Sequence, residues 1–406
     1  MKSLFTQKKF ALTKLLTYRI FMVLAYQTMT VAASWHVYQI TRDPLSLGLI
    51  GLAEVLPYFA SALFAGYCID HYSRRWFGVL AAIMLCVVGS TLAAISAGYI
   101  VGNTVYWIYA SIGFTGLARA FIAPSYSALM AIIIPRESYA KAAGIGSSIF
   151  QIGLIAGPAI GGLLVGFAST TAAYMFSATM CIGAMLALLA LRLKEPPSAE
   201  TAPVFASIGQ GLTFVWNNQI LFGAQMLDMF AVLLGGAVAM LPAFIQDIYQ
   251  LGPESLGLLR AAPAVGALCV GLYLARHPIN MHAGRVLLWA VAGFGMCIVC
   301  FGLTKNYWLA GLFLGLSGAF DGVSVVLRTT IMQLATPDGM RGRVSAINGI
   351  FIGSSNELGA FESGVAARLM GLVPSVIFGG LMTLGVVAAT AKLNPTLKQL
   401  ELSQLK

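Results

Sequence analysis

The 406-residue chain is 59% hydrophobic and only 9% charged, with a mean hydropathy of +0.85. Soluble domains of this size are far less apolar, and here apolar runs of about 20 residues recur from end to end. Composition therefore excludes a soluble enzyme and predicts an all-α polytopic membrane protein.

The net charge of +10 could indicate a nucleic-acid partner, but its distribution argues against one. Lys and Arg gather between alternate hydrophobic runs, which is the positive-inside pattern of membrane proteins. The six cysteines lack the spacing of zinc ligands or of a disulfide framework. We therefore expect membrane lipids around the chain, no nucleic acid, no metal and no cofactor.

The hydrophobic runs predict twelve transmembrane helices. They lie at roughly 15–40, 46–69, 76–99, 104–130, 142–167, 171–192, 219–246, 254–275, 285–304, 307–333, 343–369 and 372–391. An even number places both termini on one side, and that side holds 18 Lys and Arg against 3 on the other. The charge bias predicts that both termini are cytoplasmic.

The predicted organisation is two six-helix bundles, 1–192 and 219–392, followed by a cytoplasmic tail, 393–406. A linker, 193–218, joins the bundles. It opens with a Pro-rich stretch, and its apolar residues then recur at helical spacing, which predicts a short amphipathic helix on the membrane surface. Those apolar residues are Phe205, Ile208, Leu212 and Val215.

The two halves resemble each other in sequence. An offset of 202 maps Lys141 onto Arg343, Gly157 onto Gly359 and Gly162 onto Gly364. An offset of 209 maps Ser46-Leu47-Gly48 onto Ser255-Leu256-Gly257. Internal repeats in a helical membrane protein indicate a transporter whose halves rock around a central site.

A glycine-rich stretch runs from Gly153 to Gly162 inside the fifth predicted helix. Gly153, Gly157 and Gly161 recur every four residues, so they share one helix face that another backbone can approach closely. Pro158 removes a backbone hydrogen bond and is expected to bend the helix. With Gly162, these residues predict a packing and bending seam between the halves.

Two motifs resemble those of the major facilitator superfamily. The stretch Gly66-Tyr67-Cys68-Ile69-Asp70-His71-Tyr72-Ser73-Arg74-Arg75 is similar to its loop signature, although Ser73 replaces a glycine. Gly153–Gly162 matches every defined position of its antiporter motif. The resemblance implies a cytoplasmic gate, which we assign to Gly66, Asp70, Arg74, Arg75, Arg341 and Arg343.

Segments 44–57 and 258–263 also resemble the enterobactin-exporter-like branch of bacterial exporters. This likeness covers most of the chain when it is taken with the two motifs. It implies the twelve-helix major facilitator fold and a drug:proton antiporter or related exporter.

Eight ionisable residues lie in or near the predicted helices, where each costs about 2.5–3.5 kcal/mol at mid-helix. They are Glu54, Arg119, Asp228, Arg260, Asp321, Arg328, Glu357 and Glu362. One interpretation is fixed ion pairs that orient helices. The other is a substrate path or proton relay, because five acids outnumber three arginines and an unpaired buried carboxylate favours binding a proton.

The repeats place opposite charges at matching sites, since 202 added to Arg119 gives Asp321, and Glu54 aligns with Arg260. We therefore predict that Arg119 and Asp321 face each other. Asp228 lies about ten residues into its helix, roughly 15 Å deep. The predicted coupling acids are Asp228 and Glu357, followed by Asp321 and Glu54.

The first predicted helix is unusually polar, and Gln27 and His36 are assigned to a wet central cavity. His36 has no second histidine at ligand spacing in its helix, so we expect a hydrogen-bonded interior residue rather than a metal ligand. These residues complete the predicted substrate cavity.

The sequence thus predicts a secondary transporter in the bacterial inner membrane, a monomer that exports a small amphiphilic molecule such as a drug, siderophore or metabolite in exchange for protons. Uptake carriers and lipid translocators on the same fold remain alternatives. A membrane enzyme or receptor is disfavoured, because the chain contains no P-loop, nucleophile elbow, H-E-x-x-H motif or soluble domain.

Overall fold

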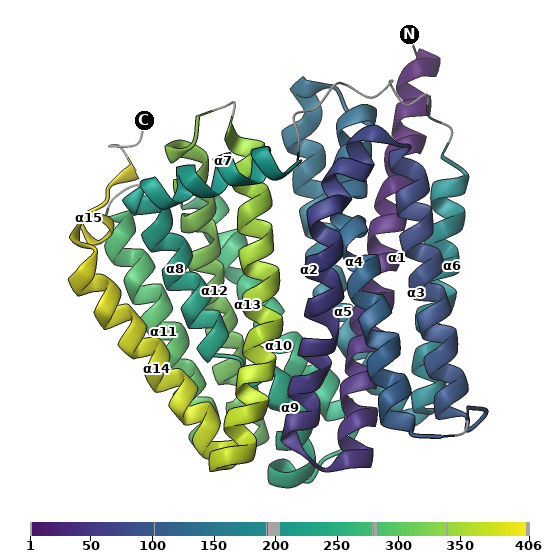
Figure 1. Ribbon diagram of the computed structural model, residues 1–406, viewed down its shortest axis with the longest axis vertical. Coiled ribbons are helices and arrows are strands. Elements are labelled where there is room, and N and C mark those ends of the chain that lie inside the picture. Colours follow the sequence, from purple (N-terminus) through teal and green to yellow (C-terminus); the bar gives the residue numbers. More distant parts are fainter. Residues whose placement is uncertain are drawn as a thin grey trace. The chain divides into compact units, whose positions relative to one another are not determined.

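The computed structural model of the 406-residue chain describes residues 2–100, 102–191, 193, 204–277, 279, 282–337 and 340–402. This described part is helical throughout (Figure 1). The first six helices are α1 (Lys2–Thr41), α2 (Pro44–His71), α3 (Arg74–Ser96), α4 (Thr104–Ile133), α5 (Arg136–Phe167) and α6 (Thr170–Leu189).

The second half begins with the linker helix α7 (Val204–Asn217). There follow α8 (Gln219–Leu234), the 3₁₀ turn η1 (Ala237–Met240), α9 (Leu241–Ala243), the π-helix η2 (Phe244–Tyr249), α10 (Pro253–Arg276), α11 (Ala283–Leu303), α12 (Tyr307–Ala335), α13 (Arg341–Met370), α14 (Leu372–Leu393) and α15 (Pro395–Lys398).

Among the described residues, eleven stretches are long and apolar enough to cross a membrane, with α8 to η2 counted as one span. The remaining predicted span, 343–369, is the eleventh in chain order and forms α13, which is too polar to belong to that set. Its 30 residues extend about 45 Å, so length is not the obstacle. Glu357, Glu362 and Arg368 within the helix account for its low hydropathy. The predicted all-α polytopic fold is confirmed.

The chain divides into two compact units. The first comprises Met1–Ile40, Ala53–Thr201 and Gly252–Leu258, and the second comprises Thr41–Leu52, Ala202–Leu251 and Leu259–Lys406. The start of α10 therefore packs with the helices of the first sequence half. Likewise, the start of α2 packs with the helices of the second half.

Corresponding helices pack alike in the two units. In the first unit α3 packs against α4 and α6, and in the second α11 packs against α12 and α14. A Cβ at Gly89 of α3 would lie 3.2 Å from the backbone nitrogen of Ala178 in α6, so these helices touch backbone to backbone. Such close approach is typical of helix packing in lipid.

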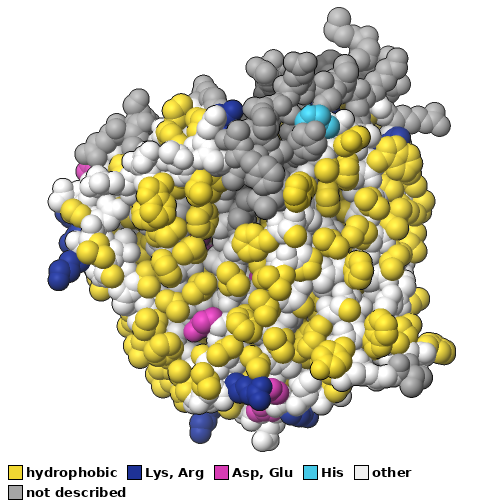
Figure 2. Space-filling view, viewed as in Figure 1, with side chains coloured by type: hydrophobic (Ala, Val, Ile, Leu, Met, Phe, Trp, Pro, Cys, Tyr) yellow, Lys and Arg dark blue, Asp and Glu magenta, His cyan; other side chains and the backbone are white. Residues whose placement is uncertain are grey.

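Apolar side chains cover much of the visible surface (Figure 2). On α3 the exposed side chains of Leu80, Ile83 and Val87 recur at helical spacing. The opposite side of this helix buries Leu85 and Leu92 within the unit. A helix that is apolar on both its buried and its exposed side fits a lipid environment.

The seventh predicted span, 219–246, is discontinuous. Helix α8 ends at Leu234, and Gly235-Gly236 leads into a short 3₁₀ turn and a π-helix. A Cβ at Gly236 would lie 2.8 Å from the carbonyl oxygen of Gly359 in α13. Glycine therefore permits the close approach, and its weak helix propensity explains the break.

The predicted amphipathic linker helix is present as α7. On one side Gly211 packs against α13, where a Cβ would lie 2.7 Å from the side chain of Ile347. Val215 is also buried, whereas Leu212 and Trp216 are exposed. Exposed Trp and Leu on a surface helix are typical of the membrane interface. The side chains of Phe205 and Ile208 lie outside the described residues.

Part of the predicted tail, 393–406, is folded. Leu397 and Leu400 are buried in the hydrophobic core of the second unit. The Asn394 side-chain amide donates to the carbonyl of Gln219 at 3.0 Å. These contacts hold α15 against the start of α8.

Candidate functional site

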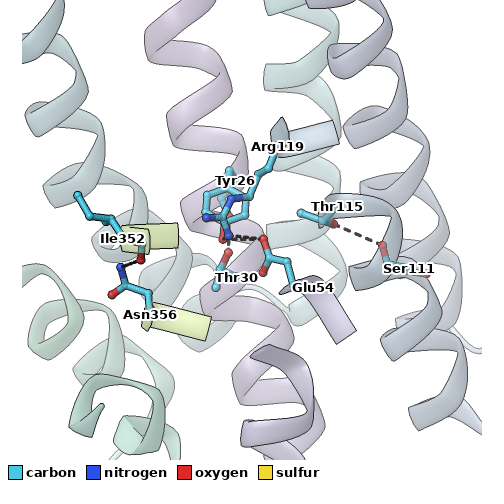
Figure 3. A network of polar contacts seen from close by, with 8 residues as sticks. All are labelled: Tyr26, Thr30, Glu54, Ser111, Thr115, Arg119, Ile352 and Asn356. Carbon is cyan, nitrogen blue, oxygen red and sulfur yellow. Dashed lines mark hydrogen bonds and ion pairs between the residues drawn. The ribbon is translucent and has the colours of Figure 1, made fainter. Parts of the chain in front are cut away.

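Three polar side chains meet inside the first unit, one each from α1, α2 and α4 (Figure 3). Arg119 donates through Nη1 to Glu54 Oε1 at 2.5 Å and to Tyr26 Oη at 2.8 Å. Tyr26 in turn donates its hydroxyl to the same carboxylate oxygen at 2.9 Å. We call Tyr26, Glu54 and Arg119 the N-terminal charge cluster.

Helix packing positions this cluster. A Cβ at Gly116 of α4 would overlap the backbone carbonyl oxygen of Glu54, so glycine lets α4 approach α2 one turn before Arg119. Glu54 is only 3% exposed. The Arg119 guanidinium lies 5.0 Å from the ring centroid of Tyr26 and 5.4 Å from that of Tyr58. Hydrogen bonds and aromatic contacts therefore both hold the buried pair.

A second group of charges lies inside the second unit, on α8 and α12. Arg328 Nη1 contacts Asp228 Oδ2 closely, and its Nη2 lies 3.9 Å from Asp321 Oδ1. Arg328 Nε donates to the Ser324 hydroxyl at 3.1 Å. Asp321, Ser324 and Arg328 follow at spacings of three and four, so they share one face of α12. We call Asp228, Asp321 and Arg328 the C-terminal charge cluster.

The two clusters differ in charge balance. The N-terminal cluster holds one acid and one base. The C-terminal cluster holds two acids, and no other described base lies within 4.0 Å of either one. The side chain of Asp228 is only 7% exposed, against 42% for that of Asp321. An excess negative charge in a membrane interior is costly, so this cluster can bind a proton or a cation.

A neutral polar pair lies one helical turn from Asp228. Gln225 of α8 is buried, and its amide donates to the Asn348 side-chain oxygen of α13 at 2.8 Å. Thus α8 is bound to α12 through an ion pair and to α13 through a hydrogen bond. A change at Asp228 can therefore act on the packing of three helices.

The predicted pairing of Arg119 with Asp321 would join the two units and stays a prediction; each residue has an opposite charge within its own unit. Arg119 pairs with Glu54, and Asp321 lies near Arg328, in each case within one unit. The repeat offset gives equivalent positions on equivalent helices. The offset does not indicate the partner that each residue has within its own unit.

The other predicted cavity residues lie on several helices. Glu357 and Glu362 are half-buried on α13, and Arg260 is half-buried on α10. The Ser363 hydroxyl donates to the Glu362 carboxylate at 3.5 Å, which is a long contact. His36 Nδ1 lies 3.3 Å from the Tyr174 hydroxyl, as expected of a hydrogen-bonded interior histidine. Gln27 of α1 is half-buried against α5.

The gate motif is partly described. Arg75 donates to the carbonyl of Leu191, just beyond the end of α6, at 2.8 Å. Arg343 donates to the Gln210 side chain of α7 at 2.8 Å. Arg74 is half-buried. The surroundings of Gly66 and the side chains of Asp70 and Arg341 are not among the described parts of the chain. Arg75 therefore binds the chain just beyond the end of α6, and Arg343 binds the linker helix α7.

The glycine-rich stretch of α5 contacts two different helices. Gly153, Gly157 and Gly161 face α1, and a Cβ at Gly157 would lie 2.6 Å from the Cβ of Gln27. Thr28 of α1 donates its hydroxyl to the carbonyl of Gly157 at 3.1 Å. The predicted seam between the sequence halves must therefore be corrected for these three glycines, which pack within the first half. Helix α5 continues through Pro158.

Pro158 and Gly162 of the stretch meet the other sequence half, at Gly257 of α10. A Cβ at Gly162 would lie 2.8 Å from the Cα of Gly257 in α10. The second unit repeats this crossing, because a Cβ at Gly364 of α13 would lie 2.8 Å from the Cα of Gly48 in α2. The offsets of 202 and 209 relate these two pairs. The internal repeat is thus visible in the packing, and we call the pairs the glycine crossings.

Repeated helix packing and charged residues inside apolar helices together define the class of helical membrane transporters. Residues 15–360 match the sequence profile of the Major Facilitator Superfamily, and the chain belongs to this family. It is therefore a multi-pass secondary transporter of small molecules rather than an enzyme.

Similar proteins include exporters. The multidrug efflux pump Tap of Mycolicibacterium fortuitum is 25% identical over 390 residues, covering 92% of this chain and 93% of Tap. The enterobactin exporter EntS of Escherichia coli is 24% identical over 388 residues, with 91% and 90% covered.

The fold matches solved transporters. An inward-facing bacterial homologue of the human lysosomal transporter Spinster superposes with a TM-score of 0.74 at 14% identity, with 96% of this chain and 98% of that chain covered. A D-xylose-proton symporter has a TM-score of 0.69 at 15% identity, with 96% and 99% covered. At these identities the likeness shows the fold alone.

Sequence reasoning missed one member of each cluster and the neutral pair beside Asp228. Tyr26 was passed over, although it lies beside the polar Gln27. Arg328 was recognised as a charge within a helix but was not assigned to the site. Its spacing of seven from Asp321 was the available signal, because residues seven apart share a helix face. The Gln225–Asn348 bond joins two distant helices and left no signal in the sequence.

Proposed function

We propose that this transporter exports a small amphiphilic molecule from the bacterial cytoplasm in exchange for protons. The observation that carries the proposal is the C-terminal charge cluster, in which Arg328 lies within ion-pair distance of both Asp228 and Asp321. Export is supported by the two relatives Tap and EntS, which are a multidrug efflux pump and an enterobactin exporter. Identity near 25% leaves the substrate open, so drugs, siderophores and other metabolites are all included.

The cluster can act as a proton switch. With both aspartates ionised, Arg328 neutralises one of them and the other remains a buried or half-buried anion. A proton on either carboxylate removes that excess and leaves Arg328 to the other. Because Asp228 lies on α8 while Asp321 and Arg328 lie on α12, protonation changes the strength of the α8–α12 link. Two states of this link can bias two conformations of the transporter.

The four acids that the sequence predicts for proton coupling are ranked in this proposal by their surroundings. Asp228 and Asp321 share Arg328 and form the switch. Glu357 is half-buried on α13, the helix to which Gln225 of α8 is bonded through Asn348. It is the next candidate carrier. Glu54 is paired with Arg119 and has the weaker case.

We place the chain in the inner membrane with both termini in the cytoplasm. The support is the bias of Lys and Arg between alternate spans. The glycine crossings supply smooth contacts at which helices can shift during alternating access. A monomer contains both repeats and is sufficient for this cycle.

An uptake carrier or a lipid translocator is the alternative, because the fold is shared with a D-xylose-proton symporter. Direction can be tested in inside-out vesicles loaded with no substrate. A panel of fluorescent cationic, neutral and anionic dyes is added outside, and a pH gradient, acidic inside, is imposed. Export by proton exchange predicts gradient-dependent dye accumulation that collapses with a protonophore. Accumulation that ignores the gradient would contradict proton coupling, and accumulation only with the reversed gradient would indicate symport.

A further inference from the structure

Arg19 of α1 is held by aromatic rings inside the first unit. Its guanidinium carbon lies 4.0 Å from the ring centroid of Tyr126 in α4 and 5.0 Å from that of Phe150 in α5. The Arg19 Nε and the Tyr126 hydroxyl are buried and have no hydrogen-bond partner in the described part of the chain. Two unsatisfied polar atoms thus lie at one place.

Arg19 lies within the candidate membrane span Phe10–Thr41 rather than at its first residues. Lys14, five residues earlier on α1, donates to the carbonyl of Ala190 just beyond the end of α6, at 2.7 Å. Five helical residues correspond to about 7.5 Å. Arg19 is therefore displaced along α1, away from the level at which α6 ends and toward the centre of the span.

Two other arginines within the spans have carboxylates. Arg119 pairs with Glu54, and Arg328 contacts Asp228 and Asp321. For Arg19, no carboxylate of the described residues lies within 4.0 Å. An arginine at the centre of a membrane helix costs about 2.5–3.5 kcal/mol on insertion scales, and a partner normally offsets that cost. The missing partner indicates that an anion from outside the chain completes the site.

The two rings at Arg19 differ in exposure. Phe150 is 37% exposed, whereas Tyr126 is only 8% exposed. Tyr126 packs against Gly146 of α5, where any larger side chain would overlap its hydroxyl. One ring is thus fixed between two helices while the other is exposed. The rings contact the guanidinium and restrain it, which leaves its N–H groups to bind an oxyanion in a forked geometry.

The geometry points to Arg19, with Tyr126 and Phe150, as a binding site for the carboxylate of a transported amphiphile. This assignment rests on the proposed export function and narrows its substrate class to molecules that carry an organic acid group. Arg19 would bind this group in the cytoplasmic part of the first unit, before the substrate reaches the charge clusters. The phosphate of an anionic lipid has related chemistry and is the alternative source of the oxyanion.

The test compares 1-naphthoate with its neutral analogue 1-naphthamide. The full-length protein is purified in dodecyl maltoside, and its melting temperature is followed during titration with each compound at constant ionic strength. A ligand that binds only the folded protein raises the melting temperature. The wild type should be stabilised by naphthoate at concentrations at least about tenfold lower than by naphthamide, which corresponds to about 1.4 kcal/mol.

Arg19→Gln should abolish the preference for naphthoate. Arg19→Lys keeps the positive charge but loses the paired N–H donors of the guanidinium, so it should weaken naphthoate binding several-fold. Arg42→Gln alters an exposed arginine paired with Asp247 and should change nothing. Melting temperatures without ligand control for folding. If Arg19→Gln fails to fold, Arg19→Lys still tests the site. Equal stabilisation by both compounds in the wild type, or an unchanged preference in Arg19→Lys and Arg19→Gln, overturns the assignment.

A titration with lipids distinguishes a substrate carboxylate from a lipid phosphate as the oxyanion at Arg19. Dioleoyl phosphatidylglycerol is titrated against phosphatidylcholine in the same assay. Stabilisation by phosphatidylglycerol that requires Arg19, without an effect of naphthoate, would assign the site to a lipid and overturn the substrate proposal. The assay uses no pH gradient, so it is independent of coupling. Naphthoate binding through Arg19 combined with gradient-independent flux would refute proton exchange alone.

Discussion

Both charge clusters use the equivalent helices α4 and α12 of the two repeats, but they carry different charges. Arg119 and Asp321 occupy matching positions, separated by the offset of 202, so one repeat has a base where the other has an acid. Each cluster then takes its remaining members from its own unit. The N-terminal cluster is balanced, and the C-terminal cluster has one carboxylate in excess. A balanced cluster suits a structural brace, whereas an unbalanced one suits a proton carrier.

The largest expected effect comes from removing the base that the two aspartates share. Arg328→Gln leaves both Asp228 and Asp321 without their arginine, and breaking a buried ion pair by removing one partner costs about 3–5 kcal/mol. We expect gradient-driven transport to disappear and the melting temperature of the purified protein to fall. An Arg328→Gln variant with normal gradient-driven flux would show that the cluster is not required.

The next largest effect is expected if the N-terminal cluster stabilises the packing of its helices. Exchanging its charges in Glu54→Arg with Arg119→Glu should restore much of the stability lost in either single variant, because the same pair is rebuilt in reverse. Thermal unfolding of the three proteins measures this coupling. Additive losses would indicate that Glu54 and Arg119 act separately, for example as proton or substrate ligands.

A third effect concerns the glycine crossings. Gly162→Leu or Gly364→Leu adds a side chain whose Cβ would lie only 2.8 Å from the Cα of the partner glycine, so helix movement should be blocked while ligand binding is retained. Transport should fall at least about tenfold, equivalent to about 1.4 kcal/mol on the rate-limiting barrier. Gly144→Ala is the control on α5, because a Cβ there has no neighbour within 4 Å. Equal losses in the control would point to general damage instead.

A smaller effect is expected at Tyr26. Tyr26→Phe removes a hydroxyl that accepts from Arg119 and donates to Glu54 but keeps the ring under the guanidinium. Hydrogen bonds of this kind contribute about 1.5–3 kcal/mol when a charged group takes part. Chemical or thermal unfolding should show a loss within that range, with gradient-driven transport preserved. Loss of gradient dependence at full stability would give Tyr26 a role in proton transfer.

Much of the fold could be predicted from the sequence, and the reason is physical. Backbone groups in lipid must bond within their own helix, so hydrophobic length alone located the spans. Glycines related by 202 and 209 indicated that the two halves would pack alike, and Gly162·Gly257 and Gly364·Gly48 do so. Hydropathy describes helix α13 less well, because this segment remains helical while carrying Glu357 and Glu362.

The site was less predictable. Hydrophobicity identified the charged residues because each is exceptional in a membrane helix, but it said nothing of which ones meet. The rotation of α12 decides that Arg328 reaches Asp228, and the packing of Gly116 against α2 decides that Arg119 reaches Glu54. Both depend on tertiary contacts between distant segments. The aromatic surroundings of Arg19 likewise come from α4 and α5, which no pattern within α1 reveals.

The most direct test of the central claim compares Asp228→Asn with Glu54→Gln in proteoliposomes. For each variant, substrate exchange without a gradient is measured beside efflux driven by an imposed pH gradient. We predict that Asp228→Asn retains exchange but loses the response to the gradient, while Glu54→Gln keeps the response in a less stable protein. A gradient response preserved in Asp228→Asn and lost in Glu54→Gln would contradict the proposed switch and would assign the proton to the N-terminal cluster.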